Sequence, residues 1–276
     1  MLRDQMTMLI LSCDAFSDLW DGHVKLLEEN WPDREMDTYL VTDAPTDKRY
    51  DHVKIIAAGA DLAWSERLSR ALDAVRTPYV FVTLDDYFLI RKVPTGWMVQ
   101  LLALMERHSL DYVRLYPKPE NAARESIEGD KNVFRIDNKT EYGVNLYSSI
   151  WRADFLQSTV SEKRNIWEYE VSLPKAAVDY GAKCAVSKNQ EFKILDVVRK
   201  GKLLHAANAY FRKHPGVYAG NRELQTWSYE AKLWVKTMVS WHTHGKLRKF
   251  IRDTLRKRGY QFYSDGFENW ENEGKT

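Results

Sequence analysis

Short apolar segments that end in small or acidic residues alternate with segments of helical periodicity in the first part of the chain. The two clearest apolar segments run from Met8 to Ser12 and from Tyr79 to Leu84. The second is β-branched and aromatic and follows Pro78, which is typical of a buried strand. Strands and helices that alternate at such intervals predict a parallel sheet with helices on both faces. Further strands are expected from Met36 to Val41 and from Lys54 to Ala57, and helices from Leu19 to Glu29 and from Ser65 to Val75.

The second part of the chain continues the pattern with less regularity. Helices are expected from Gly96 to His108 and from Trp167 to Tyr180, and Gly181 ends the second one. Residues 117–139 are polar and irregular, which predicts a surface loop or a small hairpin. From about Leu224 the chain becomes a long helical extension. The remaining strands are expected from Asp111 to Tyr116, Leu146 to Trp151, Lys183 to Val186 and Phe192 to Val198.

Composition restricts the class of protein. The chain has 276 residues, enough for one large α/β domain or two small ones with a core that needs no disulfides. A formal net charge of +2 does not indicate a nucleic acid partner. Cys13 and Cys184 lie far apart and outside any zinc-ligand spacing, which excludes a zinc ribbon. With no signal peptide and no apolar stretch long enough to cross a bilayer, a cytoplasmic protein is expected.

The acidic pair Asp85-Asp86 directly follows the clearest strand. Parallel sheets bind their ligands beyond the carboxyl ends of the strands. Magnesium and manganese prefer oxygen ligands, and they commonly share their shell between one or two carboxylates and phosphate oxygens. The pair therefore indicates a divalent-cation site that binds a nucleotide diphosphate and neutralises it as the leaving group. The alternative is a solvated turn after a strand.

His205 follows a basic segment that contains Arg199, Lys200 and Lys202. A histidine in this position would complete the metal shell, and the three basic side chains would meet phosphate. The alternative is a structural histidine with a satisfied ring.

Two carboxylates, Glu168 and Glu170, lie near a helix start among the aromatic residues Trp167 and Tyr169. Aromatic faces pack on sugar rings, and a carboxylate can take a proton from an acceptor hydroxyl. The alternative is that both acids only stabilise the first turn of the helix electrostatically.

Taken in order, these segments resemble bacterial glycosyltransferases of capsule, exopolysaccharide and lipopolysaccharide O-antigen synthesis. The resemblance covers roughly residues 8 to 215. One departure is Ile166, where relatives carry Pro. The similar stretches are Ser12 to Trp20, Trp64 to Leu68, Leu84 to Leu89, Ser149 to Leu156, Trp167 to Glu170 and Arg199 to Lys202.

The resemblance implies a GT-A fold that binds a nucleotide sugar at the first half of the sheet and the acceptor at the second. Asp86 would bind the metal directly, Asp85 would contact the donor sugar or ribose, and His205 would be the C-terminal metal ligand. Glu168 falls where inverting enzymes keep their base, with Glu170 as the other candidate. Donor contacts are expected from Ser12, Asp14, Asp43, Arg67, Asp85, Arg199, Lys200 and Lys202, and acceptor contacts from Trp151, Trp167 and Tyr169.

The helical extension is basic and amphipathic. Leu247, Phe250, Ile251 and Leu255 share one helical face, and Trp234 and Trp241 lie upstream. This pattern indicates a helix at an anionic membrane surface, and the alternative is a helix that packs on the catalytic domain. A cluster of its basic residues consists of Lys246, Arg248, Lys249, Arg252, Arg256, Lys257 and Arg258.

The sequence thus predicts an α/β GT-A catalytic domain over residues 1–223 and a tail over 224–276. The nucleotide-sugar half is expected over about 1–110 and the acceptor half over about 111–223. The expected activity is transfer of a hexose, with inversion, from a UDP-sugar to a glycan or lipid-linked acceptor, with manganese or magnesium, at the inner membrane face. The alternatives are a nucleotidyltransferase acting on sugar phosphates and a non-catalytic protein that binds nucleotide sugars. Both a monomer and a dimer are compatible with the sequence.

Overall fold

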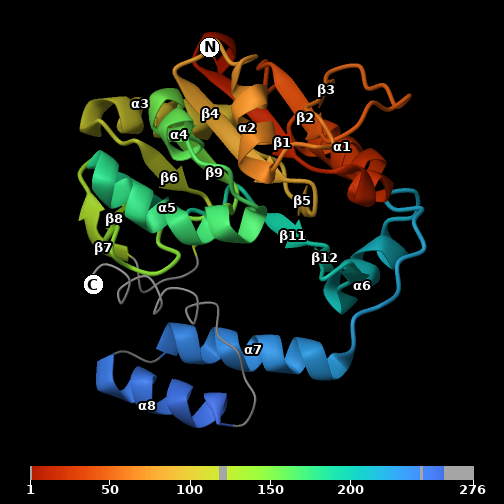
Figure 1. The fold of residues 1–276 in the computed structure, drawn as a ribbon. Coiled ribbons are helices and arrows are strands. Elements are labelled where there is room, and N and C mark those ends of the chain that lie inside the picture. The colour runs from red at the N-terminus through yellow and green to blue at the C-terminus, as the bar shows by residue number, and fades with distance from the viewer. Residues whose placement is uncertain (1, 118–122, 243–244, 258–276) are drawn as a thin grey trace.

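A computed structural model describes residues 2–117, 123–242 and 245–257. Within this part of the chain nine strands form one sheet, in the order β3-β2-β1-β4-β9-β6-β10-β8-β7 (Figure 1). The strands are β1 (Met6–Leu11), β2 (Thr38–Thr42), β3 (Lys54–Ala57), β4 (Tyr79–Leu84), β6 (Tyr112–Arg114), β7 (Ala123–Ile127), β8 (Asp130–Ile136), β9 (Ser149–Arg152) and β10 (Cys184–Ser187). The helices that flank the sheet are α1 (Ser17–Asn30), α2 (Trp64–Leu72), α3 (Thr95–His108), α4 (Ala153–Thr159) and α5 (Ile166–Tyr180).

The first four strands of the sheet are parallel. β1 pairs with β4 along its whole length, from Met6 opposite Tyr79 to Leu11 opposite Leu84, and also pairs with β2. All six residues of β1 are buried, as expected for a strand covered on both faces. Beyond β4 the sheet is mixed, because β9 lies antiparallel between β4 and β6. The predicted α/β fold with a mostly parallel sheet is confirmed.

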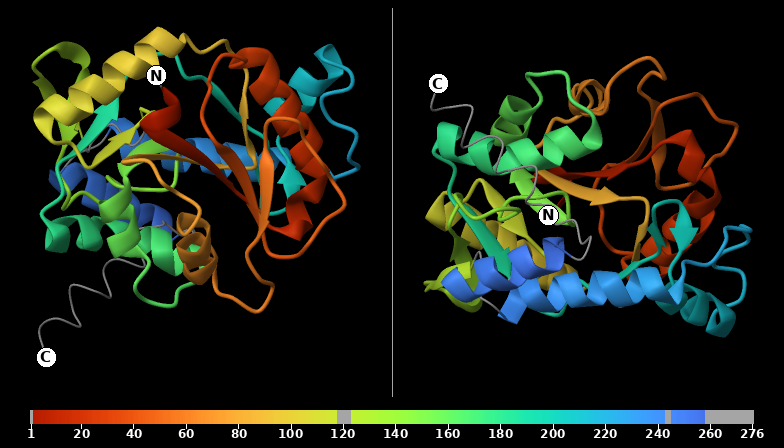
Figure 2. Two further views of the ribbon diagram at one scale, coloured as in Figure 1. Left: turned by 90° about the horizontal axis from the view of Figure 1, so that it is seen from above. Right: turned by 60° about the horizontal axis from the view of Figure 1, so that its bottom comes forward.

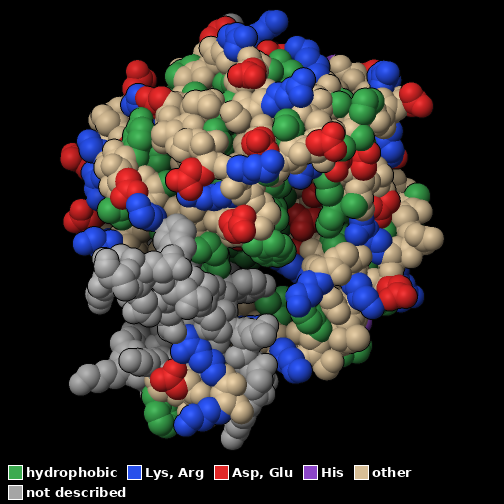
Figure 3. All heavy atoms as spheres, viewed as in Figure 1, with side chains coloured by type: hydrophobic (Ala, Val, Ile, Leu, Met, Phe, Trp, Pro, Cys, Tyr) green, Lys and Arg blue, Asp and Glu red, His purple; other side chains and the backbone are tan. Residues whose placement is uncertain are grey.

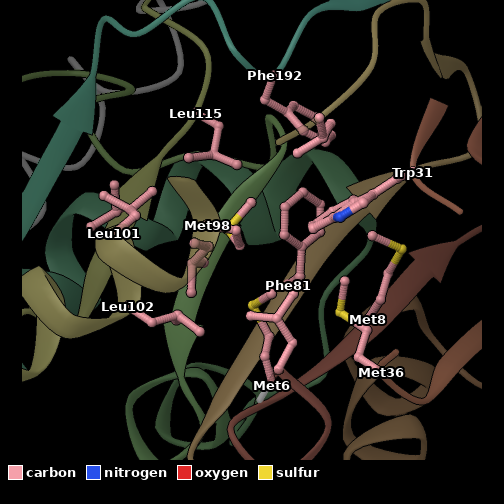
Figure 4. Close-up of a cluster of buried hydrophobic side chains, with 14 of the residues drawn as sticks. Met6, Met8, Trp31, Met36, Phe81, Met98, Leu101, Leu102, Leu115 and Phe192 are labelled. Carbon is pink, nitrogen blue, oxygen red and sulfur yellow. The ribbon is translucent and has the colours of Figure 1, made fainter. Parts of the chain in front are cut away.

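Helices cover both faces of the sheet (Figure 2), and an apolar cluster of side chains lies on each face. On one face α1 and α3 pack, and Trp31 and Phe192 lie against Phe81 of β4 (Figure 4). On the other face α2, α4 and α5 pack around Trp151 and Tyr169. This double cover explains why the strands read as continuous apolar runs rather than alternating ones.

A smaller sheet adjoins the carboxyl edge of the main one. Its strands are β5 (Tyr87–Leu89) and β11 (Ile194–Asp196), which pair antiparallel with Tyr87 opposite Asp196. The expected single strand from Phe192 to Val198 is therefore shorter and lies in this second sheet. A further hairpin of β12 (Val198–Arg199) and β13 (Lys202–Leu203) follows. Residues 117–139 contain the β7–β8 hairpin, which confirms the hairpin interpretation and extends the main sheet.

Three helices complete the described chain: α6 (His205–Lys213), α7 (Trp227–His242) and α8 (Gly245–Arg256). α6 packs with β5, β11 and α1 in a third apolar cluster that includes Phe88, Val197 and Phe211. The helices α7 and α8 lie below the sheet in Figure 1. None of the helices described here combines the length and apolar character that a bilayer crossing requires. Arg258, the last basic residue of the predicted tail helix, lies outside the described residues.

Gly22 of α1 provides a test of this packing. A Cβ atom there would lie 2.0 Å from the carbonyl oxygen of Val217, a backbone atom with little freedom to move. Gly22→Ala should therefore lower the free energy of unfolding by about 1–3 kcal/mol, the usual effect of overpacking. Gly96→Ala in α3 is the control, because its new Cβ would meet nothing within 4 Å. Urea unfolding that gives both variants equal stability would contradict the close contact between α1 and Val217.

Candidate active site

The carboxyl ends of β1 and β4 bring Ser12 and Asp85 together. The Ser12 hydroxyl donates a hydrogen bond to Oδ2 of Asp85 and accepts one of 2.6 Å from Nε1 of Trp20. Behind the pair, Nδ1 of His23 lies 3.1 Å from the carbonyl oxygen of Asp85. Asp85 is only 6% exposed. Ser12 thus fixes the carboxyl group of Asp85, and residues of α1 contact Ser12 and the Asp85 backbone.

The small sheet brings a third carboxylate to the acidic pair. The amide of Val197 donates to the carbonyl oxygen of Asp86 at 2.9 Å, which extends the pairing of β11 with β5. Asp196, the last residue of β11, thereby lies near Asp86. Its Oδ2 accepts two hydrogen-bonding contacts from the guanidinium of Arg199, at 2.6 and 2.8 Å. Residues more than one hundred positions apart in the chain form this cluster.

Among the described residues, two oxygens of the cluster have no hydrogen-bond donor. Oδ1 of Asp86 and Oδ1 of Asp196 are both buried and accept no hydrogen bond. Burial, followed by repulsion from Asp196 and Asp85, raises the pKa of Asp86 well above its ordinary value. Burial also raises the pKa of Asp196. Buried carboxylate oxygens without a donor are costly, so this arrangement is suited to a cation.

Arg199 provides positive charge within this cluster. Burial alone would lower its pKa, but Tyr87, Asp196, Tyr147 and Asp86 together raise it. Arg199 is therefore a permanent cation among acids, and its planar group is suited to phosphate oxygens as well as to Asp196. Figure 3 shows the molecule hollowed below the sheet, with acidic side chains in its depth and Lys and Arg side chains nearby.

Three tyrosines and Glu170 lie near the acidic cluster, since Tyr147 is within electrostatic range of Arg199, Asp196 and Glu170. Tyr147 stacks on Tyr87 and on Tyr116, with ring centroids 5.5 and 4.4 Å apart. Oε1 of Glu170 accepts a weak hydrogen bond of 3.4 Å from the amide of Leu146. Burial raises the pKa of Glu170, while this hydrogen bond and the charge of Arg199 lower it. The carboxyl group therefore faces the interior, within electrostatic range of Arg199.

Glu168 has a different environment. Its side chain is exposed and Oε2 accepts the amide of Asn165 at 2.9 Å, while the Asn165 side chain accepts the amides of Trp167 and Glu168. This reciprocal capping box starts α5, whose first residue is Ile166. The structure thus places Glu168 at the helix cap and Glu170 beside the acidic cluster.

A second group of predicted donor residues lies at the ends of β1 and β2. The amide of Asp14 donates to Oδ1 of Asp43 at 2.6 Å, and Thr42 donates to Asp14 at 2.8 Å. Arg67 of α2 lies 3.5 Å from Oδ2 of Asp43, and its buried Nε atom has no acceptor in the described part of the chain. These residues adjoin a small hollow lined by Leu11, Ser12, Val41, Trp64, Arg67 and Leu68.

The basic residues and His205 lie on the β12–β13 hairpin and at the start of α6. Lys200 occupies the turn with a positive φ of 52°, and Lys202 pairs with Glu223 at 2.7 Å. Nδ1 of His205 lies 2.8 Å from Glu230 of α7, and its ring stacks on Trp227. Within the described part of the chain, no group of three or more His, Cys, Asp or Glu side chains is arranged so that it could bind a metal ion. The expected shell of Asp85, Asp86 and His205 is therefore not assembled without a ligand.

The expected acceptor residues divide into two kinds. Trp151 and Tyr169 have no exposed surface: Trp151 packs between Tyr112 and Phe155, and Tyr169 bonds to Thr159. Their burial corrects the expectation that they contact an acceptor. Trp167 is 62% exposed at the start of α5 and stays a candidate.

Sequence reasoning missed Asp196 and the three tyrosines. Asp196 ends the short strand β11 and Asp85 directly follows β4, and this similarity is a signal that the sequence contains. The choice between the two glutamates also has a signal. Glu170 lies four positions after Ile166 and three before Leu173, so it lies on the face of α5 that packs against the sheet. Glu168 does not lie on this face.

The sequence and the fold were compared with those of known proteins. No model of a known protein family matches the chain, and no curated protein matches it significantly. Among solved structures, S. aureus TarS in complex with UDP-GlcNAc is similar, with a TM-score of 0.48 and 12% identity over 72% of this chain and 60% of that one. UDP-glucose pyrophosphorylase complexed with UDP-glucose has a TM-score of 0.49 and 11% identity over 76% and 99%. The bifunctional IspDF from Campylobacter jejuni has a TM-score of 0.42 and 14% identity over 70% and 52%.

The chain thus spans 60% of the TarS chain and 52% of the IspDF chain. At these identities the function has to be argued from the site itself.

The buried carboxyl group of Asp85 gives a test of the electrostatics. Burial raises its pKa from 3.8 to about 7. The folded protein therefore keeps a proton that the unfolded chain releases, and stability falls as the pH rises from 3.8 to about 7. Asp85→Asn should flatten this part of the profile of melting temperature against pH, and the exposed Asp51→Asn should not. Parallel profiles for Asp85→Asn and the unchanged protein would contradict the burial argument.

Proposed function

We propose that the protein is a metal-dependent glycosyltransferase that transfers a sugar from a UDP-linked donor. The single observation that carries the proposal is the pair of buried, unpartnered oxygens on Asp86 and Asp196 beside Arg199. A divalent cation that is bound by one or two carboxylates takes the rest of its shell from water and from substrate phosphates. The cluster therefore fits a cation that arrives together with a diphosphate.

Asp86 and Asp196 would hold the metal, which is manganese or magnesium. When bound, the cation neutralises the charge that develops on the departing diphosphate. Arg199, with Lys200 and Lys202 on the adjoining hairpin, would contact the phosphates. His205 remains a candidate ligand, because the diphosphate and metal together add contacts that the ligand-free structure does not have.

The nucleoside would bind at the ends of β1 and β2. Asp14, Asp43 and Arg67 lie together there and leave the buried Nε of Arg67 without an acceptor. Uracil presents carbonyl acceptors and a ring N–H, which match an arginine donor and a carboxylate acceptor. Asp85 lies between this position and the metal pair, where the ribose or donor sugar would lie.

The proposed reaction is direct displacement with inversion. An acceptor hydroxyl attacks the anomeric carbon, the bond from that carbon to the diphosphate oxygen breaks, and UDP leaves. The hydroxyl proton passes to Glu170, whose raised pKa suits a general base. Trp167, exposed beside the start of α5, would stack on the acceptor sugar.

The rival activity is nucleotidyl transfer to a sugar phosphate. Enzymes of that class need a glycine-rich basic loop after the first strand. Here the segment after β1 is Ser12 to Phe16, which contains no glycine and no basic residue. Sugar transfer is therefore the better fit, in the synthesis of a capsular, exopolysaccharide or lipopolysaccharide glycan.

A screen of nucleotide sugars tests this function directly. UDP-sugars should raise the melting temperature more with manganese than without it, because a ligand stabilises the state that binds it. GDP-, CMP- and dTDP-sugars serve as controls for the base. Release of UDP that depends on an added acceptor glycan would support sugar transfer. Formation of UTP from a UDP-sugar and pyrophosphate would instead support nucleotidyl transfer and overturn the proposal.

The two glutamates give a matched pair of variants. Glu170→Gln should lower kcat by roughly 10²–10⁴ with little change in donor affinity, the usual effect of losing a general base. Glu168→Gln should leave the rate within a few-fold of the unchanged protein, because its side chain only caps α5. Initial rates at saturating donor measure both. A large loss in Glu168→Gln with an active Glu170→Gln would reverse the assignment.

We further propose that α8 attaches the enzyme to an anionic membrane at its cytoplasmic face, where lipid-linked acceptors lie. Phe250 of α8 is 69% exposed, and Trp234 of α7 is 63% exposed. Apolar residues exposed beside a basic helix are typical of interfacial membrane helices. Each cation near an anionic leaflet contributes about 1 kcal/mol, an attraction that salt screens.

A flotation assay tests the membrane role. The protein should bind vesicles that contain phosphatidylserine at low salt and leave them at high salt. Binding should be lost when Lys246, Arg248, Lys249, Arg252, Arg256 and Lys257 become Gln. Gln at Lys54, Lys92 and Lys131, which are exposed on the catalytic domain, is the control. Intact protein that ignores anionic vesicles at low salt would overturn the membrane role.

A further inference from the structure

The start of α7 is attached to the hairpin that carries the basic residues. Leu203 of β13 accepts the amide of Gln225 at 2.8 Å and donates its own amide to Glu223 at 2.9 Å. The Gln225 side chain donates to the carbonyl oxygen of Arg199 at 3.1 Å. Thr226 then accepts the amide of Glu230 at 3.1 Å and begins the helix. The first turn of α7 is therefore fixed relative to Arg199.

Glu230 makes two contacts with one residue. Its Oε1 accepts the backbone N–H of His205 at 3.0 Å and lies 2.8 Å from Nδ1 of the same histidine. Trp227, one turn earlier on α7, stacks on the imidazole with ring centroids 3.6 Å apart and planes inclined by 23°. His205 and Glu230 are both largely covered, with side chains 18% and 21% exposed. The imidazole ring is therefore held at its edge by Glu230 and on its face by Trp227.

These contacts decide which ring nitrogen carries the proton. A carboxylate oxygen only accepts, so Nδ1 of His205 must donate to Glu230. In the neutral imidazole, Nε2 is then the nitrogen with a free lone pair. A carboxylate that holds the second nitrogen of a histidine in this way is the usual support of a metal-binding imidazole. Glu230 also adds to the raised pKa of Asp196, after burial, so it lies within electrostatic range of the acidic cluster.

We propose that α7 belongs to the catalytic unit and that Glu230 is a positioning residue. It holds His205 as the Nδ1–H tautomer and so presents Nε2 to the metal-diphosphate complex of the donor. The consequence is that the first turn of the tail is needed for donor binding, whatever its later part does at a membrane. This inference rests on the proposed function for the ligand, but the tautomer is a property of the protein alone.

Two measurements test the proposal together. In ¹⁵N–¹H long-range spectra above pH 8, the His205 ring, assigned by comparison with His205→Gln, should show the Nδ1–H pattern. Glu230→Ala should shift it towards Nε2–H, and Glu230→Gln should keep it, because the amide oxygen still accepts. Calorimetry should show manganese-dependent UDP affinity reduced 10–100-fold in Glu230→Ala, the usual effect of losing such a support. Lys232→Ala, an exposed charge change on the same helix, is the control.

An Nε2–H pattern in the unchanged protein would overturn the proposal and needs no variant that might misfold. So would a folded Glu230→Ala that keeps either its tautomer or its UDP affinity, because Glu230 would then only cap α6. If the unchanged protein binds no UDP with manganese, the proposed function fails. The tautomer measurement still reports on the Glu230–His205 contact in that case.

Discussion

The site depends on the burial of more carboxyl groups than the neighbouring cations of the protein can pair. Asp85, Asp86, Asp196 and Glu170 are carboxyl groups whose pKa burial raises, and Arg199 is the cation that lies among them. Two of their oxygens accept no hydrogen bond from any residue that the structure describes. Such an arrangement lowers stability and persists in proteins at functional sites, where a ligand supplies the missing charge.

Two sheets bring these carboxyl groups together. The parallel strands β2, β1 and β4 end at one edge, so Asp43, Ser12 and Asp85 follow one another along it. The short β5–β11 ladder then brings Asp196 and Arg199 to Asp86 from the far end of the chain. The apolar cluster around Phe88 and Val197 anchors that ladder on α1. The metal-binding half of the site thus depends on packing that is distant from the acidic pair in sequence.

The arrangement of the strands decides which residues of the site can be predicted from the sequence. Asp14, Asp43 and Asp85 are predictable because each follows an apolar run, and parallel strands end at one edge. Asp196 is harder, because β11 and its partner β5 have three residues each and no pattern shows which strands pair. In the sequence, Trp151 and Tyr169 have the character of aromatic residues that stack on a sugar ring. In the structure their rings fill the layer between the sheet and α4 or α5. The helical periodicity of α5 predicts the placement of Glu170, because Glu170 lies three positions before the buried Leu173 and therefore on the same face of the helix.

Calorimetry of UDP with and without manganese tests the central claim most directly. The account predicts that manganese strengthens UDP binding to the unchanged protein and that Asp86→Asn and Asp196→Asn each lose this strengthening while remaining folded. The exposed Asp51→Asn should retain it. Folded Asp86→Asn and Asp196→Asn proteins that bind UDP with an unchanged response to manganese would contradict the account.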